Sequence, residues 1–255
     1  MKKIFIIIFC FAAMHLASAQ DVFIAKGKIE FERKVNLHKE IESWGSDDED
    51  GGGDEWLNNF KKMVPQFELS YFNLLFENNK TLYQPGRELP VDPKVPDWFR
   101  GPANDNIVLT ELDLQKQISQ KTVYDNTFLI TDSLRKVDWR ITNDRRTIAG
   151  FECRKAVGRI MDSVYVIAFY TDQITVSGGP ESFCGLPGMI LGIAIPRINT
   201  TWFATKLELE DVKAESFTAP KKGKKMNEQQ LMQQLQSSLK DWGKYGQRNI
   251  WKISI

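Results

Sequence analysis

The tripeptide Leu186-Pro187-Gly188 stands directly before an apolar run, and these two neighbouring features constrain the fold more than any other part of the chain. Proline fixes φ at about −65° and glycine adopts a positive φ without steric cost, so this order predicts a type II turn. The run that follows, residues 189–195, contains no charged side chain and predicts a strand buried on both faces. We therefore expect a sheet whose central strand starts at a tight turn.

Period-two alternation of apolar and polar residues dominates most of the other readable segments. Residues 28–35 alternate in this way, and so do residues 203–209, where Phe203 and Leu207 share the apolar face. Each pattern is typical of a strand with one solvated face in an antiparallel sheet. Residues 163–171 are apolar on both faces and predict a central strand that pairs with the apolar run.

Short strand candidates separated by turn residues fill much of the remaining chain. They are residues 68–76, 81–84, 107–114, 121–124, 128–131, 139–141 and 147–157. This spacing predicts a mainly β fold, either an antiparallel curved sheet or a partly closed barrel, with a β-sandwich as the alternative.

A helical pattern replaces the alternation near the end of the chain, over residues 226–242. Its apolar stripe consists of Leu231, Leu235, Leu239 and Trp242. Asn227 and Gln230 form a capping pair at the start, and Gly243 can end the helix. The stripe predicts packing against the sheet, with binding of a partner as the alternative. A short amphipathic helix is also expected over residues 55–63.

Two loops are expected from composition. Residues 46–55 are acidic and glycine-rich, and Asp47, Asp48 and Asp50 make them a weak candidate for Ca²⁺, although an EF-hand register would put Leu57 at the final ligand position.

The second loop covers residues 84–106, where five prolines rule out a regular element. Its aromatic pair Trp98 and Phe99 is expected to anchor the loop and is our candidate for a ligand or partner surface. No internal repeat or boundary divides residues 20–255, so we expect one domain.

The first 19 residues have the features of a secretory signal peptide. Lys2 and Lys3 supply the charged start, an apolar stretch follows, and Ala17-Ser18-Ala19 is an A-x-A cleavage site. The apolar stretch is too short to span a membrane, and no later segment is long enough. The mature chain is therefore expected to be periplasmic or secreted, with no transmembrane segment.

Charge and cysteine content change when the signal peptide is removed. Loss of Lys2 and Lys3 from 34 basic residues leaves 32 against 33 acidic ones, so no basic excess favours nucleic-acid binding. Two cysteines remain, Cys153 and Cys184. In an exported chain two cysteines usually pair, so we expect a structural disulfide between them.

The motifs of common enzymes are missing from the mature sequence. His38 is its one histidine, which excludes hydrolytic triads and multi-histidine metal sites. No G-x-S-x-G elbow or P-loop occurs. We expect no catalytic residue, no metal and no cofactor, although sequence spacing cannot eliminate a carboxylate pair of the kind that hydrolyses glycosides.

Residues 184–193 resemble the signature of the GLPGLI family, exported Bacteroidetes proteins of uncertain function, with Met189 where the family usually has leucine. The signature turn, as we call it below, consists of Gly185, Leu186, Pro187 and Gly188. Three earlier blocks occur in the family's order, at residues 139–141, 148–156 and 168–174.

The resemblance implies a periplasmic protein, often encoded near TonB-dependent outer-membrane transporters. In such bacteria Asp-Ser followed by an aliphatic residue can accept an O-glycan, which makes Ser133 a candidate site and Ser163 a weaker one. We expect a non-enzymatic binding or accessory protein that acts with such a transporter or holds an apolar ligand. A carboxylate-based envelope hydrolase is the alternative, and a purely structural role is the third.

Overall fold

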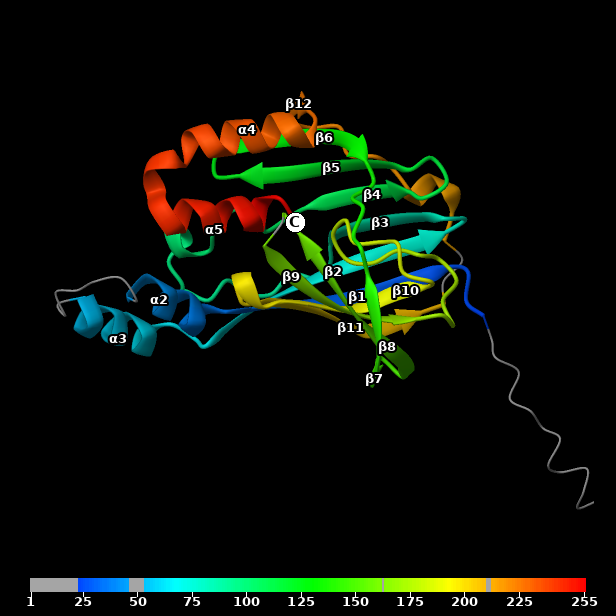
Figure 1. The fold of residues 1–255 in the computed structure, drawn as a ribbon, viewed down its shortest axis with the longest axis horizontal. Coiled ribbons are helices and arrows are strands. Elements are labelled where there is room, and N and C mark those ends of the chain that lie inside the picture. The colour runs from blue at the N-terminus through cyan, green and yellow to red at the C-terminus, as the bar shows by residue number, and fades with distance from the viewer. Residues whose placement is uncertain (1–22, 46–52, 162, 210–211) are drawn as a thin grey trace, which may run out of the picture.

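A computed structural model describes residues 23–45, 53–161, 163–209 and 212–255 (Figure 1). The signal peptide and the acidic residues Asp47, Asp48 and Asp50 lie outside these residues. The predictions made for them therefore stay predictions.

The strands of the structure follow one another through most of the chain. They are β1 (Gly27–Asn36), β2 (Phe67–Glu77), β3 (Lys80–Pro85), β4 (Ile107–Glu111), β5 (Lys116–Val123), β6 (Asn126–Ser133), β7 (Arg140–Ile148), β8 (Phe151–Ile160), β9 (Val164–Thr171), β10 (Met189–Ile195), β11 (Thr200–Glu208) and β12 (Lys224–Met226).

All these strands belong to one 12-stranded sheet with the order β12-β6-β5-β4-β3-β2-β1-β11-β10-β9-β8-β7. Neighbours are antiparallel, except that β12 pairs with β6 in parallel. The sheet curves, as strand twist requires of so many strands, and its edges β12 and β7 do not meet (Figure 1). The prediction of a curved antiparallel sheet is confirmed, and the residues that the structure describes form neither a closed barrel nor a sandwich.

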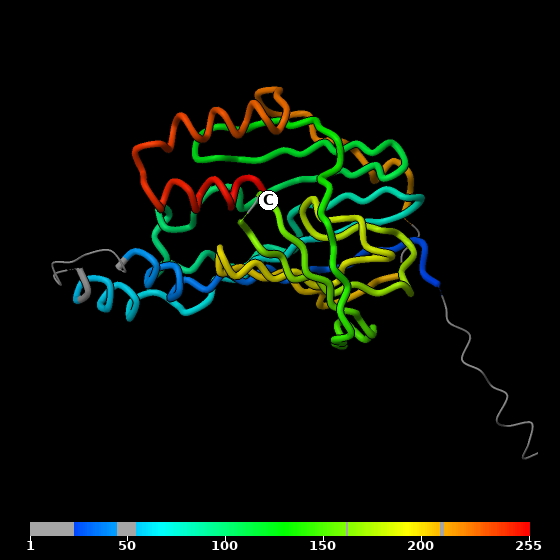
Figure 2. The backbone as a smooth tube through the Cα atoms, viewed as in Figure 1, coloured from blue at the N-terminus to red at the C-terminus, as the bar shows by residue number. Residues whose placement is uncertain are grey.

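The helical segments lie at one end and along one side of the sheet. They are α2 (Leu37–Gly45), α3 (Gly53–Met63), α4 (Glu228–Ser238) and α5 (Gly243–Ile253), with short 3-10 turns η2 (Asp97–Phe99), η3 (Pro196–Ile198), η4 (Ala214–Ser216) and η5 (Lys240–Trp242). In Figures 1 and 2, α4 and α5 lie side by side and antiparallel, next to β5 and β6. The helices α2 and α3 project at the left-hand end.

The predicted C-terminal helix is correct at its start and wrong at its end. Asn227 and Gln230 form the expected capping box. The helix ends before Leu239, however, and Gly243 with φ of +53° begins a second helix, α5, that the sequence did not predict. Leu231, Leu235 and Leu239 are buried as expected, but Trp242 is 45% exposed. The reversal at Gly243 turns this ring away from the stripe.

The apolar run forms β10, which is buried almost throughout and pairs with β9, as predicted. The second face of β9 is only partly covered, because Tyr165 is 60% exposed. β9 pairs with β8 as well as with β10, so the prediction of a central strand is confirmed.

The sequence-based prediction that Phe203 and Leu207 share one face of β11 is wrong. Glu30 pairs with Lys206 and Phe31 pairs with Ala204, so Thr205 is an extra residue in β11, a β-bulge. A bulge changes which side chains share a face. Leu207 lies opposite buried Ile29, whereas Phe203 lies opposite Glu32 on the other face.

Three apolar clusters hold the elements together. The largest fills the inner face of the sheet and is closed by the loop that runs from Ile174 to Leu186. The second joins α4 and α5 to β5 and β6, and the third joins α2 and α3 to the proline-rich loop through Val95 and Phe99.

The signature turn requires glycine at its last position. Gly188 has a φ of +134°, and a Cβ there would lie 2.1 Å from the carbonyl oxygen of Thr171. The turn is tighter than predicted, because the Gly188 N–H donates to the Leu186 carbonyl at 2.8 Å, while the Met189 N–H donates to Ile174 at 3.1 Å. It is therefore a three-residue turn about Pro187 and not a type II turn.

The predicted Cys153–Cys184 disulfide does not form in the structure, where both residues are free, buried thiols. The indole N–H of Trp139 donates to the Cys184 carbonyl at 2.9 Å, and the same ring covers Gly158. The Cys153 thiol donates to the Phe151 carbonyl of its own strand at 3.5 Å. Burial raises the pKa of Cys153 to about 12 and also raises the pKa of Cys184, which favours the protonated form of both thiols.

Candidate functional site

Aromatic side chains form a continuous series of ring contacts where α2, α3, η2, η5, α5 and the β5–β6 turn meet. In spatial order the members are Tyr124, Trp242, Tyr245, Trp44, Trp98, Phe60 and Trp56. We call them the aromatic series. Successive ring centroids are 5.9, 5.7, 6.0, 6.1, 5.5 and 5.3 Å apart. These separations are typical of aromatic pairs in contact.

The middle of the series is anchored by buried rings. Phe60 of α3 is 5% exposed and stacks between Trp56 and Trp98, with interplanar angles of 10° and 18°. Phe99 is 3% exposed and meets Trp44 and Phe60 edge to face. The outer rings are therefore held in fixed orientations by packing from below.

Several rings of the series remain open to solvent. Trp98 is 59% exposed, Trp56 54%, Tyr124 46% and Trp242 45%. Of the two residues predicted to form a ligand or partner surface, Trp98 thus lies on the surface, whereas Phe99 supports it from within. Contiguous exposed apolar surface on a folded chain is a mark of a binding site.

A pocket opens in the centre of the series. It has a volume of about 450 Å³ and is lined by Ser43, Trp44, Trp98, Lys244 and Tyr245. This size and this mixture of aromatic walls with a few polar groups are typical of small-ligand sites.

A buried ion pair fixes the two helices that carry this pocket. The Lys252 ammonium of α5 donates to Glu40 of α2 at 2.8 Å, and the Arg248 guanidinium lies 3.8 Å from the same carboxylate and donates to the Ser43 hydroxyl. Burial lowers the pKa of Lys252, and the charge of Glu40 opposes that shift. The pair thus sets the spacing of Trp44 and Tyr245 before any ligand binds.

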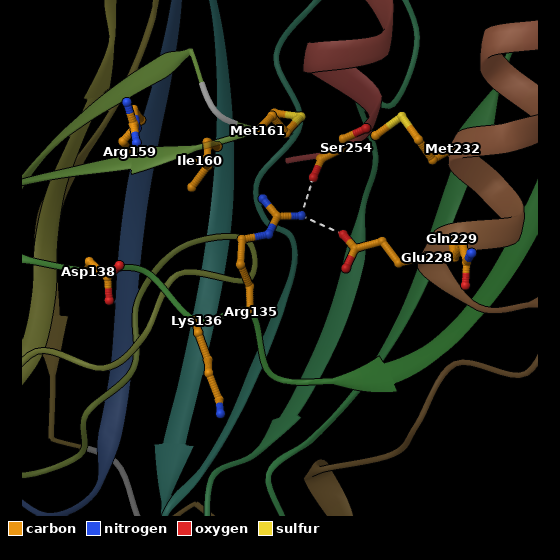
Figure 3. Close-up of a pocket in the computed structure, with 10 residues that line it drawn as sticks. All are labelled: Arg135, Lys136, Asp138, Arg159, Ile160, Met161, Glu228, Gln229, Met232 and Ser254. Carbon is orange, nitrogen blue, oxygen red and sulfur yellow. Dashed lines mark hydrogen bonds and ion pairs between the residues drawn. The ribbon is translucent and has the colours of Figure 1, made fainter.

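A second pocket of about 670 Å³ lies between the start of α4 and the β8–β9 turn (Figure 3). Its central side chain is Arg135, which donates to Glu228 and to the Ser254 carbonyl. Asp138 also lines the pocket, while the Lys136 side chain points away from the Arg135 guanidinium (Figure 3). Because Arg135 is already held by the protein's own acceptors, this pocket does not present a free cluster of cations.

The remaining predicted residues are dispersed. Ser133 is exposed at the end of β6, and its hydroxyl donates to Asp132 at 3.3 Å, so the O-glycan site remains a prediction. His38 lies on α2, with its Nε2 3.2 Å from the Val64 carbonyl. Within the part of the chain that the structure describes, no group of three or more His, Cys, Asp or Glu side chains could hold a metal ion.

Most members of the aromatic series were missed by reasoning from the sequence. Trp44 and Trp56 carry no local signal of a binding surface, Trp242 was assigned to a packing stripe, and Tyr245 lies on the unpredicted α5. One local signal pointed to the site, the Trp98-Phe99 pair within a proline-rich loop.

Comparison with protein families gives one match. Residues 113–192, from just before β5 to β10 and including the signature turn, match the family described as "Protein of unknown function (Porph_ging)". The match is consistent with a Bacteroidetes family of unknown function. No curated protein matches the chain.

Two solved structures are similar to this chain at low identity. "Structure of PNGF-II in P21 space group" is 14% identical with a TM-score of 0.49, and covers 80% of this chain and 32% of that one. "Structure of PNGF-II in C2 space group" is 13% identical with a TM-score of 0.49, and covers 89% and 33%. This chain thus spans about a third of the length of those chains, and the similarity carries no argument about function.

Proposed function

We propose that this protein is a non-catalytic binding or accessory protein of the cell envelope, which holds its ligand or partner on the aromatic series. The pocket between Trp44, Trp98 and Tyr245 carries the proposal, because its walls are flat apolar rings that are held in place and partly open to solvent. Sites of this kind bind through shape and apolar contact and need no reactive group.

Binding fits this pocket better than catalysis does. Its one aliphatic hydroxyl, on Ser43, donates to the Glu40 carbonyl at 2.6 Å and accepts a hydrogen bond from Arg248. A nucleophilic serine needs a base that accepts its proton, and here a backbone carbonyl occupies that position. The pocket thus supplies positioning and apolar surface only.

The envelope location is part of the proposal and rests on the predicted signal peptide and on the resemblance of residues 184–193 to the GLPGLI signature. The described residues include no helix that combines the length and the apolar character needed to cross a bilayer. On this proposal the mature protein acts in the periplasm, with a TonB-dependent outer-membrane transporter as its partner.

A pull-down tests this proposal. The mature chain and its Trp98→Ala variant are each incubated with envelope extract, and the retained components are identified by native mass spectrometry. We expect the wild-type chain to retain an outer-membrane component or a ligand that the variant loses. If neither a partner nor a ligand is recovered with the wild-type chain, the proposed function is wrong.

A carboxylate-based hydrolase is a second candidate because Asp138 and Glu228 both line the pocket in Figure 3. Most glycoside hydrolases use two carboxyl groups in one cleft. Arg135 engages Glu228 directly, which favours a structural role for that acid. Release of reducing sugar from polysaccharide substrates that Asp138→Asn and Glu228→Gln each abolish would establish this candidate. Equal release by the variants, or no release, would remove it.

A further inference from the structure

The exposed apolar side chains around the aromatic series are nearly all aromatic. On α2, α3, η2, η5, α5 and the β5–β6 turn, the large apolar residues that the structure shows as exposed are Trp56, Met63, Trp98, Tyr124 and Trp242. Met63 alone among them is not a ring. Exposed aliphatic side chains such as Leu89 and Val91 line a different groove, beside β2. A lipid surface is usually met by aliphatic as well as aromatic side chains, so flat rings are the distinctive element here.

Short polar side chains stand next to the exposed rings in the chain. Asp97 precedes Trp98, Asp241 precedes Trp242, and Asp125 follows Tyr124, while Asn58 and Asn59 share α3 with Trp56. All these polar side chains are exposed. Carboxylates accept hydrogen bonds, and amides both accept and donate them, so these groups can pair with hydroxyls of a ligand whose flat face lies on a ring.

The series is long as well as flat. Six successive ring contacts connect Tyr124 to Trp56, and the pocket of about 450 Å³ occupies only the section around Trp44 and Trp98. A compact ligand would fill the pocket and leave Trp242 and Tyr124 unused. A chain built of repeating rings would contact several members at once.

Resting on the proposed binding function, we infer that the ligand of the aromatic series is a neutral saccharide chain. A sugar ring has C–H groups on its face and hydroxyls around its rim, which matches aromatic faces bordered by carboxylates and amides. The ligand is neutral because the exposed side chains around the rings carry charges of both signs. Asp97 and Asp241 are negative, and Lys240 and Lys244 are positive. No excess of one sign exists there to select a charged polymer.

Calorimetric titration of the mature chain tests this inference. The probes are hexasaccharides and disaccharides of β-glucan, α-glucan, xylan, mannan and chitin. We expect at least one hexasaccharide to bind, and to bind at least about tenfold more tightly than its disaccharide, because the longer chain contacts more rings. Trp98→Ala and Trp242→Ala should each weaken binding at least about tenfold. Trp242 lies outside the central pocket, so its variant tests the extended site specifically.

Two controls keep the test decisive. Tyr165→Ala removes a ring of similar exposure (60%) on β9, away from the series, and should leave binding unchanged. Trp98→Phe keeps an aromatic face and should retain most of the affinity, which separates loss of stacking from loss of folding.

The outcomes distinguish this inference from the proposed function. If no hexasaccharide binds the folded wild-type chain, or if Trp242→Ala binds as tightly as wild type, the saccharide inference is overturned. A protein recovered from envelope extract in a Trp98-dependent way, with no saccharide binding, would overturn the inference and leave the proposed function intact. If nothing in the extract depends on Trp98 either, both are wrong.

Discussion

The signature turn and the aromatic series differ in how much space surrounds their side chains. At the signature turn, Gly188 has no room for one additional carbon, and Leu186 and Met189 beside it are buried. In the aromatic series, large side chains such as Trp56 and Trp98 remain more than half exposed. The best recognised motif of the chain therefore serves packing, whereas the surface suited to binding is built from residues that belong to no recognised motif.

The largest loss of stability should come from adding a side chain at Gly188 in the signature turn. Gly188→Ala would place a carbon against the Thr171 carbonyl, and so we expect the free energy of unfolding to fall by more than about 4 kcal/mol. Gly150→Ala is the matched control, because Gly150 also has a positive φ, of +87°, but nothing lies within 4 Å of its added carbon. Backbone strain alone should cost that variant about 1 kcal/mol. Denaturant unfolding measures both, and equal losses would show that crowding at Gly188 is unimportant.

A smaller but still large effect is expected from the ion pair beneath the aromatic series. Glu40→Gln leaves the buried ammonium of Lys252 without its counter-charge, which should cost about 3–5 kcal/mol. The exposed pair of Lys61 with Glu42 is the control, and Glu42→Gln should cost less than about 1 kcal/mol. Thermal unfolding compares the two variants. If Glu40→Gln loses no more stability than Glu42→Gln, the buried ion pair does not hold α2 against α5.

The third prediction concerns pH and Lys121 of β5, whose ammonium is buried and donates to the carbonyl of Ile253 on α5, the helix that carries Tyr245 of the aromatic series, at 2.7 Å. Burial lowers the pKa of Lys121 from 10.5 to about 8. Between these values the unfolded chain binds more protons than the folded chain, so the free energy of unfolding rises with pH. Relative to Lys121→Met, wild type should gain about 3 kcal/mol from pH 8 to pH 10.5. A difference between the two proteins that stays constant over this range would contradict the lowered pKa.

The smallest effect on stability should come from the aromatic series itself. Trp98 is 59% exposed, so Trp98→Ala should lower the free energy of unfolding by only about 1 kcal/mol while it opens one wall of the pocket. Phe60→Ala, at the buried centre of the same stack, should cost about 3–5 kcal/mol. Chemical unfolding of the two variants is the measurement. Equal costs would mean that Trp98 is a structural anchor and not a surface for ligands.

The sequence was sufficient for most strands because alternation is a local property. The alternation that predicts β1 depends on neighbours two residues apart, and the apolar run that predicts β10 is equally local, so both strands form as expected. The inward face of β11 was wrong because the bulge at Thr205 is defined by pairing with Glu30 and Phe31, which are distant in the chain. Register of this kind is not encoded in any single strand.

The binding surface was only partly predictable for a similar reason. Trp98 stood out because it lies in a segment that cannot form a regular element. Its neighbours Trp44 and Tyr245 come from helices about 50 residues before it and about 150 residues after it. Their convergence depends on the turn at Gly243, which was predicted to end a helix but not to start another.

The borders of the sheet have a consequence for how copies of this chain meet. The outermost strand β7 bears Arg140, Arg145 and Arg146, and its pairing with β8 changes register between Ile141 and Arg145. At the opposite border β12 is only three residues long. Charge, irregular geometry and shortness each hinder docking of a foreign strand, so an open twelve-stranded sheet can persist at high local concentration without growing into fibrils.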